Sequence, residues 1–559
     1  MNLLGKAQQP GFWQEVREKE CYKKLVDELH AIWDKHCENT PIYALKYSDF
    51  KLFFTTGNRS VYQTPYFSRR QALNCSALLS LIYPEEEKYI VRLMDEIYAV
   101  CDEYTWCLPA HQPGLDKNNN SHVDLFASET AFALAEIDTM LGDRLEPLIR
   151  DRIRVETERR VIGSYLKNRF HWEKSTNNWN AVCTGSVACT VMLMYPELFD
   201  TLLPRFEESI EIFLSGFSRD GFCYEGCGYW HYGFGFFTVF ADMLRTYTSG
   251  EKDYFVREDV RKIATFIQKM FLSGRASVSF ADGGRTLSYQ LGLLHYLKNQ
   301  YPDDVVVYSP KFSYNVDSCG RFCRHLRSFS WFDENIYENP AADNKSAEYY
   351  APDAQWLIKR TPNYGFAAKG GSNAEHHNHN DVGSFIFAKN GHHVLTDPGS
   401  GEYTRQYFAK DTRYTILECS SRGHSVPIID GKFQRCGRDF KADGVSFENG
   451  VFSEDIAGAY GIDTLRSLKR SFSFTDDSVT LKDMFDYSGD GTITERFVTF
   501  SEPKPGENDT IIVDGAVISY DGDKTKPVIG SETGTKNATL YFIDFPLERG
   551  TTEFTCRIS

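Results

Sequence analysis

The sequence predicts a multidomain protein in which an N-terminal (α/α) toroid, an incomplete helical barrel, is followed by a C-terminal antiparallel β-sandwich. The chain has 559 residues, more than one hydrophobic core usually supports. Its apolar residues recur at helical spacing up to about residue 300, and after about residue 310 they alternate as in strands. Because helices precede strands in this way, two segregated domains are expected, at residues 1–310 and 311–559.

The helical half contains several apolar stripes separated by short polar or Gly/Pro linkers. Helices of ordinary length joined by short connections predict helical hairpins closed into a ring, rather than a simple four-helix bundle. The stripes are Val91, Met94, Ile97 and Tyr98; Phe126, Thr130, Leu134, Ile137 and Leu141; Val187, Val191 and Met194; and Phe206, Ile210, Phe213, Leu214 and Phe217.

The second half is predicted to form many short antiparallel strands. Residues 383–389 and 392–396 flank Asn390-Gly391, and this dipeptide is a strong signal for a hairpin turn. Similar apolar runs separated by turn residues indicate a sandwich. These runs are residues 425–429, 471–474, 478–481, 497–500, 510–513 and 540–543.

The composition narrows the classes of partner. The formal net charge is −15, with 77 acidic against 62 basic residues, which argues against a nucleic-acid partner but leaves room for an acidic sugar in a locally basic cleft. No run of about 18 apolar residues occurs, so no membrane span is expected. Residues 1–20 lack the apolar core of a signal peptide, and the 14 cysteines show no framework spacing. A cytoplasmic protein with reduced thiols is expected, although a chain from which a leader had been removed would show the same features.

Aromatic residues are abundant, with 32 Tyr, 41 Phe and 8 Trp. Most are expected in the cores, but exposed rings can stack on the faces of sugar rings. This composition is also compatible with a homodimer.

A histidine-rich segment is the clearest sign of chemistry. Five of the 14 histidines fall between residues 376 and 393, and His377 and His379 form an HxH pair. On a strand, these two side chains would point to the same face. Asp397 and His424 can complete a site with His379, because zinc accepts imidazole nitrogen and carboxylate oxygen. The alternative is that these histidines only cap turns and bind backbone groups.

Three further segments of the helical half combine polar and aromatic side chains. Asn178, Trp179 and Asn180 precede an apolar helix, where asparagines ordinarily act as N-caps. Residues 220–233 hold glycines, Tyr229, Trp230 and Tyr232, and the alternative for these rings is packing. Residues 104–111 offer two more candidates for contacts with a substrate, or for packing. These candidates are Trp106 and His111.

Taken in order, these motifs resemble the heparinase II/III superfamily of polysaccharide lyases, in which an (α/α) toroid precedes an antiparallel β-sandwich. The resemblance spans roughly residues 100–430. It rests on NNWNAV at 177–182, DG-x3-EG-x2-YW-x-YG at 220–233, HxHxDxGSF at 377–385, DPG at 397–399 and GHSVP at 423–427.

The resemblance implies β-elimination at a uronic acid. An amide neutralises the uronate carboxylate, a base removes the C5 proton, and an acid protonates the departing O4. By the same resemblance Asn178 binds the carboxylate, with Asn180 as the alternative, and Tyr229 is the catalytic tyrosine, with Tyr232 as the alternative. His377 is implied as the catalytic histidine. A structural Zn²⁺ is implied on His379, Asp397 and His424.

The chain departs from the family pattern at Trp179, where several relatives have a histidine directly after the carboxylate-binding asparagine. This departure leaves the identity of the base open. Candidates for a second acid or base are Tyr403, Tyr407 and Tyr414. Candidates for binding a carboxylate or sulfate, or else solvated side chains, are Arg405, Arg413 and Arg422. Trp179, Trp106, His111 and Trp230 complete the expected substrate contacts.

The expected partner is an acidic oligosaccharide. Glycosaminoglycan fragments are the first choice, ahead of alginate, ulvan or another uronate polymer, and action on oligosaccharides or chain ends is favoured because no export signal is visible. Two other functions remain open. One is a glycoside hydrolase with paired carboxylates, either Asp220 and Glu225 or Asp124 and Glu129. The other is a protein that binds uronate glycans without turnover.

Overall fold

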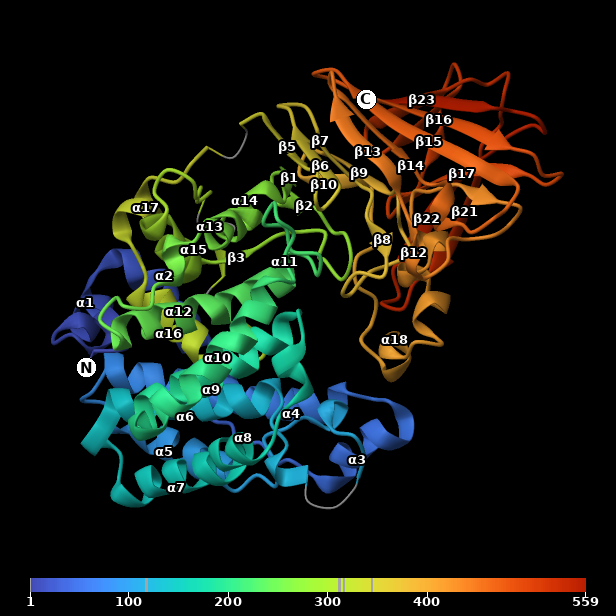
Figure 1. The fold of residues 1–559 in the computed structure, drawn as a ribbon. Helices are drawn as coiled ribbons and strands as arrows, with labels where there is room; N and C mark the ends of the chain where they lie inside the picture. Colours follow the sequence, from blue (N-terminus) through green and yellow to red (C-terminus); the bar gives the residue numbers. More distant parts are fainter. Residues whose placement is uncertain (1, 116–118, 310–312, 315–316, 343–344) are drawn as a thin grey trace. The chain divides into compact units, whose positions relative to one another are not determined.

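The computed structural model describes residues 2–115, 119–309, 313–314, 317–342 and 345–559 (Figure 1). They form two compact units. Unit 1 contains Met1–Gly216, His231–Arg261 and Tyr289–Ala341, and unit 2 contains Phe217–Trp230, Lys262–Ser288 and Ala342–Ser559. The predicted boundary between residues 310 and 311 lies outside the described residues, and the described residues on both sides of it belong to unit 1.

Unit 1 is mainly helical. Its helices are α1 (Phe12–Glu18), α2 (Lys23–His36), α3 (Tyr47–Thr56), α4 (Ser60–Ile82), α5 (Glu87–Cys101), α6 (Leu125–Leu141), α7 (Pro147–Thr157), α8 (Gly163–Lys167), α9 (Asn178–Met194), α10 (Phe199–Leu214), α12 (Gly235–Tyr247), α15 (Leu291–Gln300), α16 (Phe322–Ser330) and α17 (Glu334–Glu338). The short strands β3 (Tyr289–Gln290) and β4 (Ser313–Tyr314) pair in parallel. Helix α13 (Glu258–Ala264) crosses from unit 1 into unit 2.

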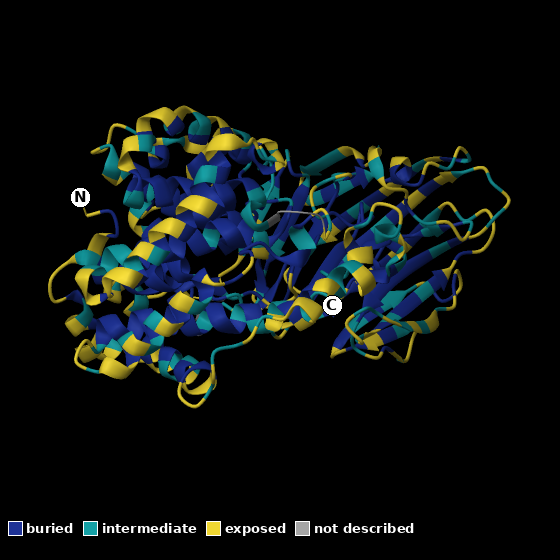
Figure 2. Ribbon diagram, turned by 90° about the horizontal axis from the view of Figure 1, so that it is seen from below, coloured by how far each residue is buried: buried dark blue, intermediate teal, exposed yellow. Residues whose placement is uncertain are grey.

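The helices of unit 1 are of two kinds. Helices α6 and α9 are buried along most of their length, whereas α2, α5 and α10 bury one stripe and expose the other face. Figure 2 shows helices of both kinds, coloured by burial. Helix α9 packs against α6, α10 and α12, and α4 packs against α2 and α5. A helix that is apolar all round needs neighbours on every side, which an amphipathic outer layer provides.

Two predicted stripes differ in detail from the structure. On α5 the buried residues include Leu93, Ile97 and Val100, while Val91 and Tyr98 are 44% and 48% exposed. Helix α10 ends at Leu214, so the predicted stripe residue Phe217 lies beyond it. The helical period was therefore predicted correctly, but the buried face of α5 is rotated from the predicted one.

Unit 2 holds the short helices α11 (Cys227–Tyr229), α14 (Phe266–Lys269) and α18 (Arg405–Phe408), and otherwise consists mainly of strands. One antiparallel sheet has the order β10 (His392–Leu395), β9 (Phe385–Lys389), β7 (Gly365–Lys369), β6 (Trp356–Arg360), β5 (Ala347–Ala351). A second has the order β11 (Ile428–Ile429), β17 (Ile493–Thr499), β22 (Thr539–Pro546), β21 (Val528–Thr533). The third has the order β13 (Asp443–Glu448), β14 (Val451–Asp455), β15 (Leu465–Phe474), β16 (Val479–Tyr487), β23 (Glu553–Ile558), β20 (Ala516–Tyr520), β19 (Thr510–Val513), β18 (Lys504–Pro505). Two further strand pairs are β1 (Phe271–Ser273) with β2 (Ala276–Ser277), and β8 (Ser372–Asn373) with β12 (Gly437–Lys441).

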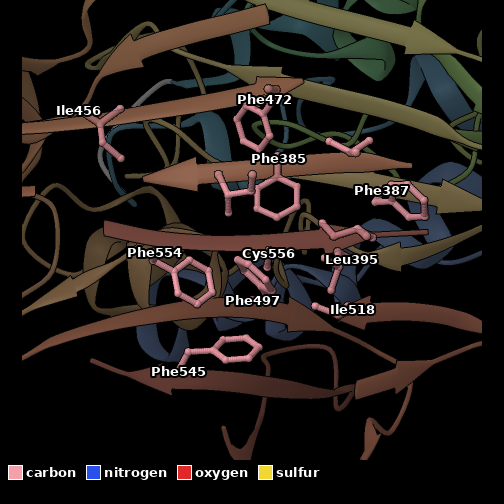
Figure 3. Packing of buried hydrophobic residues seen from close by; sticks show 14 of the residues in the cluster. Phe385, Phe387, Leu395, Ile456, Phe472, Phe497, Ile518, Phe545, Phe554 and Cys556 are labelled. Carbon is pink, nitrogen blue, oxygen red and sulfur yellow. The ribbon is translucent and has the colours of Figure 1, made fainter. Parts of the chain in front are cut away.

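One hydrophobic core joins the three sheets of unit 2 (Figure 3). Phe497 of β17 lies at its centre, with ring centroids 5.4 Å from Phe385 of β9, 5.5 Å from Phe545 of β22 and 6.3 Å from Phe554 of β23. Strands β17 and β22 belong to one sheet, whereas β9 and β23 belong to the other two, so the apolar faces of the three sheets pack against one another as in a sandwich. The predicted antiparallel β-sandwich is confirmed.

The predicted hairpin is also confirmed. Strand β9 pairs with β10 around Asn390 and Gly391, whose φ angles of 53° and 83° suit a tight hairpin turn. The predicted strand at 425–429 is shorter than expected, because only Ile428–Ile429 pair with β17.

Among the described residues, no single helix is long and apolar enough to cross a membrane. Asn178–Met194 and Pro196–Leu214 reach that length and composition only as a pair, and they are bent by 119° at the break between them.

Candidate active site and metal site

The centre of the candidate site is the carboxylate of Asp282, whose side chain is fully buried in unit 2. Its Oδ2 accepts hydrogen bonds from His377 Nδ1 at 2.6 Å and from the Tyr403 hydroxyl at 3.2 Å. The donors to its Oδ1 are His379 Nε2 at 3.2 Å, Arg413 Nη2 at 3.3 Å and the hydroxyl of Tyr407. We call these residues, together with Tyr229, the Asp282 cluster.

Tyr229 is the half-buried tyrosine at the edge of this cluster. Its hydroxyl lies 2.9 Å from that of Tyr403, and its ring stacks on His377 with centroids 4.2 Å apart and an interplanar angle of 24°. Tyr229 ends the short helix α11, and a π-helical turn begins at the next residue, Trp230. Such turns occur often at functional sites, because they rotate a side chain out of the helical register.

His377 lies in a turn, so the prediction that the HxH pair lies on a strand is wrong. Its φ of 57° is in the left-handed region, which is costly for a residue with a side chain and has to be stabilised by neighbouring contacts. Arg413 supplies such contacts, since its Nη2 donates to the carbonyl oxygens of His377 and Asn378 at 3.0 and 3.1 Å. The two histidines nevertheless meet at one carboxylate, that of Asp282.

The protonation states in the cluster follow from its charges. Burial opposes ionisation of Asp282, yet hydrogen bonds from His377 and His379 hold its pKa well below the usual value. Burial, with Asp282 close by, raises the pKa values of Tyr403 and Tyr407 well above that of a free tyrosine. Both tyrosines therefore stay protonated and donate to an ionised carboxylate.

The imidazole of His377 lies between two carboxylates. Opposite Asp282, its Nε2 is 3.4 Å from Oε2 of Glu225, which is also buried in unit 2. Because Nδ1–H is donated to Asp282, the ring orientation and tautomer of His377 are fixed by that bond.

The three predicted zinc ligands come together. One ligand atom each of His379, Asp397 and His424 lies within 4.8 Å of the others, and all three side chains are buried. Two nitrogens and one carboxylate oxygen suit zinc.

The hydrogen bonds around these histidines fit a metal. His424 Nε2 donates to the carbonyl oxygen of Glu418 at 2.9 Å, so a neutral ring turns its Nδ1 lone pair towards Asp397 Oδ2, only 3.0 Å away. His379 Nε2 donates to Asp282, and its Nδ1 is buried with no hydrogen-bond partner. The outer N–H of each histidine has the carbonyl or carboxylate partner usual for metal-bound histidines, which leaves the two Nδ1 atoms as the candidate metal ligands beside Asp397.

The loop after Asp397 depends on a glycine. Gly399 has a φ of 66°, and a Cβ built on it would lie 2.2 Å from the carbonyl oxygen of Gly283. Only glycine therefore lets the loop of the metal ligand Asp397 approach the loop that carries Asp282.

In unit 1 the three asparagines around Trp179 have different tasks. Asn177 is the N-cap of α9, and its side chain accepts from the Trp179 amide at 3.1 Å. Asn180 donates its side-chain amide to the carbonyls of Glu173, Ser175 and Ser209, so the alternative catalytic assignment to Asn180 is corrected to a structural one. Asn178, the first residue of α9, lies against Gly233, where an added Cβ would be 3.1 Å from the asparagine Cβ.

Three aromatic candidates are buried and do not offer their rings to a substrate. Tyr232 donates its hydroxyl to Glu129, and Arg321 lies over its ring at 4.1 Å. Trp106 and Trp230 are 1% and 0% exposed and donate their indole N–H to the carbonyls of Val100 and Ile263. The alternative Tyr232 and the two predicted tryptophan contacts, Trp106 and Trp230, are thus engaged by partners inside the protein.

Trp179 and His111 are partly exposed in unit 1. Their ring centroids are 4.7 Å apart, and His111 Nδ1 bonds to Asp124 at 2.7 Å. This arrangement is compatible with the predicted role of both residues in binding a substrate.

The remaining candidate residues in unit 2 differ in exposure and in the partners they contact. Arg405 is exposed on α18, whereas Arg422 pairs with Glu532 at 3.1 Å and Arg413 is engaged in the Asp282 cluster. Tyr414 donates to Asn378 Oδ1 at 2.9 Å, and burial raises its pKa.

The carboxylates of the hydrolase alternative have structural partners. Asp124 is the N-cap of α6, and Glu129 binds Tyr232 and Arg321. Asp220 accepts from the backbone amides of Asp353 and Ala354 at 2.6 and 3.1 Å. Glu225 faces His377. These contacts leave no free pair of carboxylates among the four.

Unit 1 also contains a cavity of about 940 Å³ with exposed rings in its lining. Tyr47, Tyr98 and Tyr104 are 69%, 48% and 60% exposed there, beside the carboxylates of Asp95 and Asp102. Rings with an apolar face and a polar edge suit a sugar, as the aromatic composition suggested.

Sequence reasoning missed Asp282. It lies in Ala281-Asp282-Gly283-Gly284, which reads as an ordinary turn, and it is 95 residues from His377. An acidic residue in a glycine-rich turn is too common to signal a site by itself.

Comparisons with known proteins agree with this picture. Residues 352–519 match the family model Heparinase II/III-like, C-terminal. No curated protein matches the sequence. Among solved structures, heparan sulfate lyase HepC from Pedobacter heparinus is 14% identical, with a TM-score of 0.61 over 99% of this chain and 86% of that one.

Two other solved structures share the fold. A heparinase III is 14% identical with a TM-score of 0.55, covering 98% of this chain and 91% of that one. The chondroitin AC lyase of Streptomyces coelicolor, solved with chondroitin sulphate, is 11% identical with a TM-score of 0.53, covering 98% and 81%. At these identities the likeness shows the fold, and it confirms the predicted order of toroid and sandwich. Residues 352–519 are therefore similar to the C-terminal domain of heparinase II/III-like proteins, and nearly the whole chain shares its fold with these lyase structures.

Proposed function

We propose that the protein is a polysaccharide lyase that cleaves uronic-acid-containing oligosaccharides by β-elimination, leaving a 4,5-unsaturated uronyl product. The main support is the Asp282 cluster. It presents a half-exposed phenol, Tyr229, stacked on an oriented imidazole, His377, and anchored to an ionised carboxylate. These are the group types needed to take and return a proton. The family match and the lyases that share the fold support the same reaction class.

In the proposed reaction, the C–H bond at C5 gives its proton to a base, and the electron pair forms the C4–C5 double bond as the C4–O4 bond breaks. The departing O4 takes up a proton, so no water is consumed. An amide that hydrogen-bonds the uronate carboxylate makes the C5 proton more acidic, and the sequence motif assigns this role to Asn178. Tyr229 exchanges protons with the reacting atoms, and His377, fixed by Asp282, assists it.

A bound zinc on His379, Asp397 and His424 would supply structural order to the loops that carry His377 and Asp282. Proton transfer in the proposed reaction is assigned to Tyr229 and His377, not to the metal. His379 donates to the same carboxylate that orients His377, so the metal site and the catalytic residues share one anchor.

The test is ultraviolet absorbance during incubation with heparan, chondroitin, hyaluronan and alginate oligosaccharides, followed by mass analysis. A rising absorbance with fragments that lack added water supports the lyase. Fragments with added water would show hydrolysis instead. Binding without any product would identify a non-catalytic glycan-binding protein.

A further inference from the structure

A small cavity in unit 2 adjoins the loops that carry Asp282 and Asp397. Its volume is about 150 Å³, enough for a single substituent of a sugar. Gly283 and Gly284, which line it, directly follow Asp282, and Pro398 directly follows Asp397. The cavity is therefore formed in part by the loops that carry Asp282 and Asp397.

Two basic side chains line this cavity, Arg285 and Lys536. The guanidinium of Arg285 lies 3.9 Å from the centroid of the Phe500 ring. Lys536 Nζ donates to Ser400 Oγ at 2.9 Å. Across the described residues, neither side chain has a carboxylate within ion-pair distance, whereas most arginines of this protein that are described do.

The lining also includes one acidic side chain, Glu418. Its Oε1 is engaged by the backbone N–H and the hydroxyl of Thr535, at 2.7 and 2.8 Å. Its Oε2 is buried with no hydrogen-bond partner. Two cations therefore face one carboxylate that is held by Thr535, which leaves an excess of positive charge and one acceptor suited to a hydroxyl donor.

We propose that this cavity binds an oxyanion substituent of the substrate, a sulfate or a second carboxylate, between Arg285 and Lys536. An arginine stacked on a ring keeps its N–H edge available for a bidentate bond to such a group, and a lysine adds a mobile point charge. A neighbouring sugar hydroxyl satisfies Glu418 Oε2. The inference rests on the proposed function, since it names the class of sugar that the same site selects.

The experiment uses Arg285→Met and Lys536→Met, which remove the charge and keep an apolar stem against the cavity wall. Arg275→Met and Lys432→Met, at exposed positions of unit 2, are matched controls. Steady-state rates are measured on heparan tetrasaccharides with and without sulfate, and on alginate oligosaccharides, in which every sugar carries a carboxylate.

Each cavity variant should raise KM for the preferred, more highly charged substrate about tenfold with little change in kcat. Each variant should therefore no longer prefer that substrate to the less charged one. Preference for the sulfated tetrasaccharide identifies sulfate as the ligand, and preference for alginate identifies a carboxylate. An unchanged preference in both variants, or an equal loss on all substrates, overturns the proposal.

If the wild-type protein forms no unsaturated product, the proposed function fails. Calorimetric binding of the same oligosaccharides then tests separately whether the cavity binds an oxyanion. A tenfold weaker affinity in both variants supports the oxyanion site. Equal affinities in wild type and variants, or no binding to the wild type, overturn it.

Discussion

The hydroxyl groups of Tyr229 and Tyr403 lie 2.9 Å apart, and Tyr403 in turn donates to Asp282. A carboxylate only accepts, so the proton of Tyr403 points to Asp282 and its oxygen is left to accept from Tyr229. The two phenols and the carboxylate form a directed chain that orients the hydroxyl of Tyr229.

Tyr229→Phe should lower kcat by about a hundredfold or more, because it removes the proposed acid or base. Tyr403→Phe should lower kcat less, about tenfold, since it removes only the group that orients Tyr229. Both are measured by ultraviolet absorbance under saturating substrate. Tyr520→Phe, at a tyrosine of β20 outside the Asp282 cluster, is the matched control. A normal rate in Tyr229→Phe would contradict the assignment.

Asp282→Asn keeps the shape of the side chain and removes its charge. We expect kcat to fall on the order of 100-fold with a small change in KM, because His377 and Tyr403 lose their ionised acceptor. The control is Asp353→Asn, which removes a carboxylate paired with the exposed Arg219. An unchanged kcat would show that Asp282 does not position these groups.

Asn178→Ala and Asn180→Ala should have different effects, the first on turnover and the second on stability. Asn178→Ala should lower turnover and leave the thermal midpoint close to wild type, as expected of a group that binds the uronate. Asn180→Ala should destabilise the fold by about 2 kcal/mol or more, because three backbone carbonyls, two of them in buried hydrogen bonds, lose their donor. Turnover and thermal unfolding are measured on both proteins. Loss of stability in Asn178→Ala with normal turnover would reverse the assignment.

Zinc should bind at about one ion per chain, through His379, Asp397 and His424. His424→Ala should lose the ion and lower the thermal midpoint by about 5 °C or more, since metal binding stabilises the folded state. Elemental analysis and thermal unfolding check both points, with His392→Ala at an exposed position as the control. Equal zinc contents in the two variants would refute the predicted ligand set.

Stability should fall as the pH drops from about 6.5 towards 4. Burial lowers the pKa of His295 to about 4, and its Nδ1 accepts a hydrogen bond from the Asp333 amide. Between about pH 6.5 and 4, His295 therefore stays neutral in the folded state but is protonated in the unfolded state. More protons bind to the unfolded state in this window, so the free energy of unfolding rises with pH.

At pH 5 this histidine should lower the free energy of unfolding by on the order of 1–2 kcal/mol. His295→Asn, which retains an acceptor but does not titrate, should flatten the dependence of the thermal midpoint on pH. The exposed His392→Gln should leave it unchanged. Equal pH slopes in wild type and His295→Asn would contradict the expectation.

The sequence by itself determined the local periods and turns. The segregation of helices and strands, and the hairpin at Asn390-Gly391, follow from side-chain spacing and backbone preferences that act over a few residues. The order of motifs indicated a resemblance to heparinase II/III-like proteins, and the family model matches residues 352–519. The resemblance implied His379, Asp397 and His424 as one ligand set, and the structure brings these three side chains together.

Only the tertiary structure decided which of several similar residues are engaged. Asp282 meets His377 and Tyr403 across 95 and 121 residues of chain, and no local pattern encodes such a meeting. Likewise, Asn180 and Tyr232 are occupied by structural partners, whereas Tyr229 faces His377. Residue type specifies what a side chain can bind, but burial and the partners that the fold brings within hydrogen-bond distance decide what it does bind.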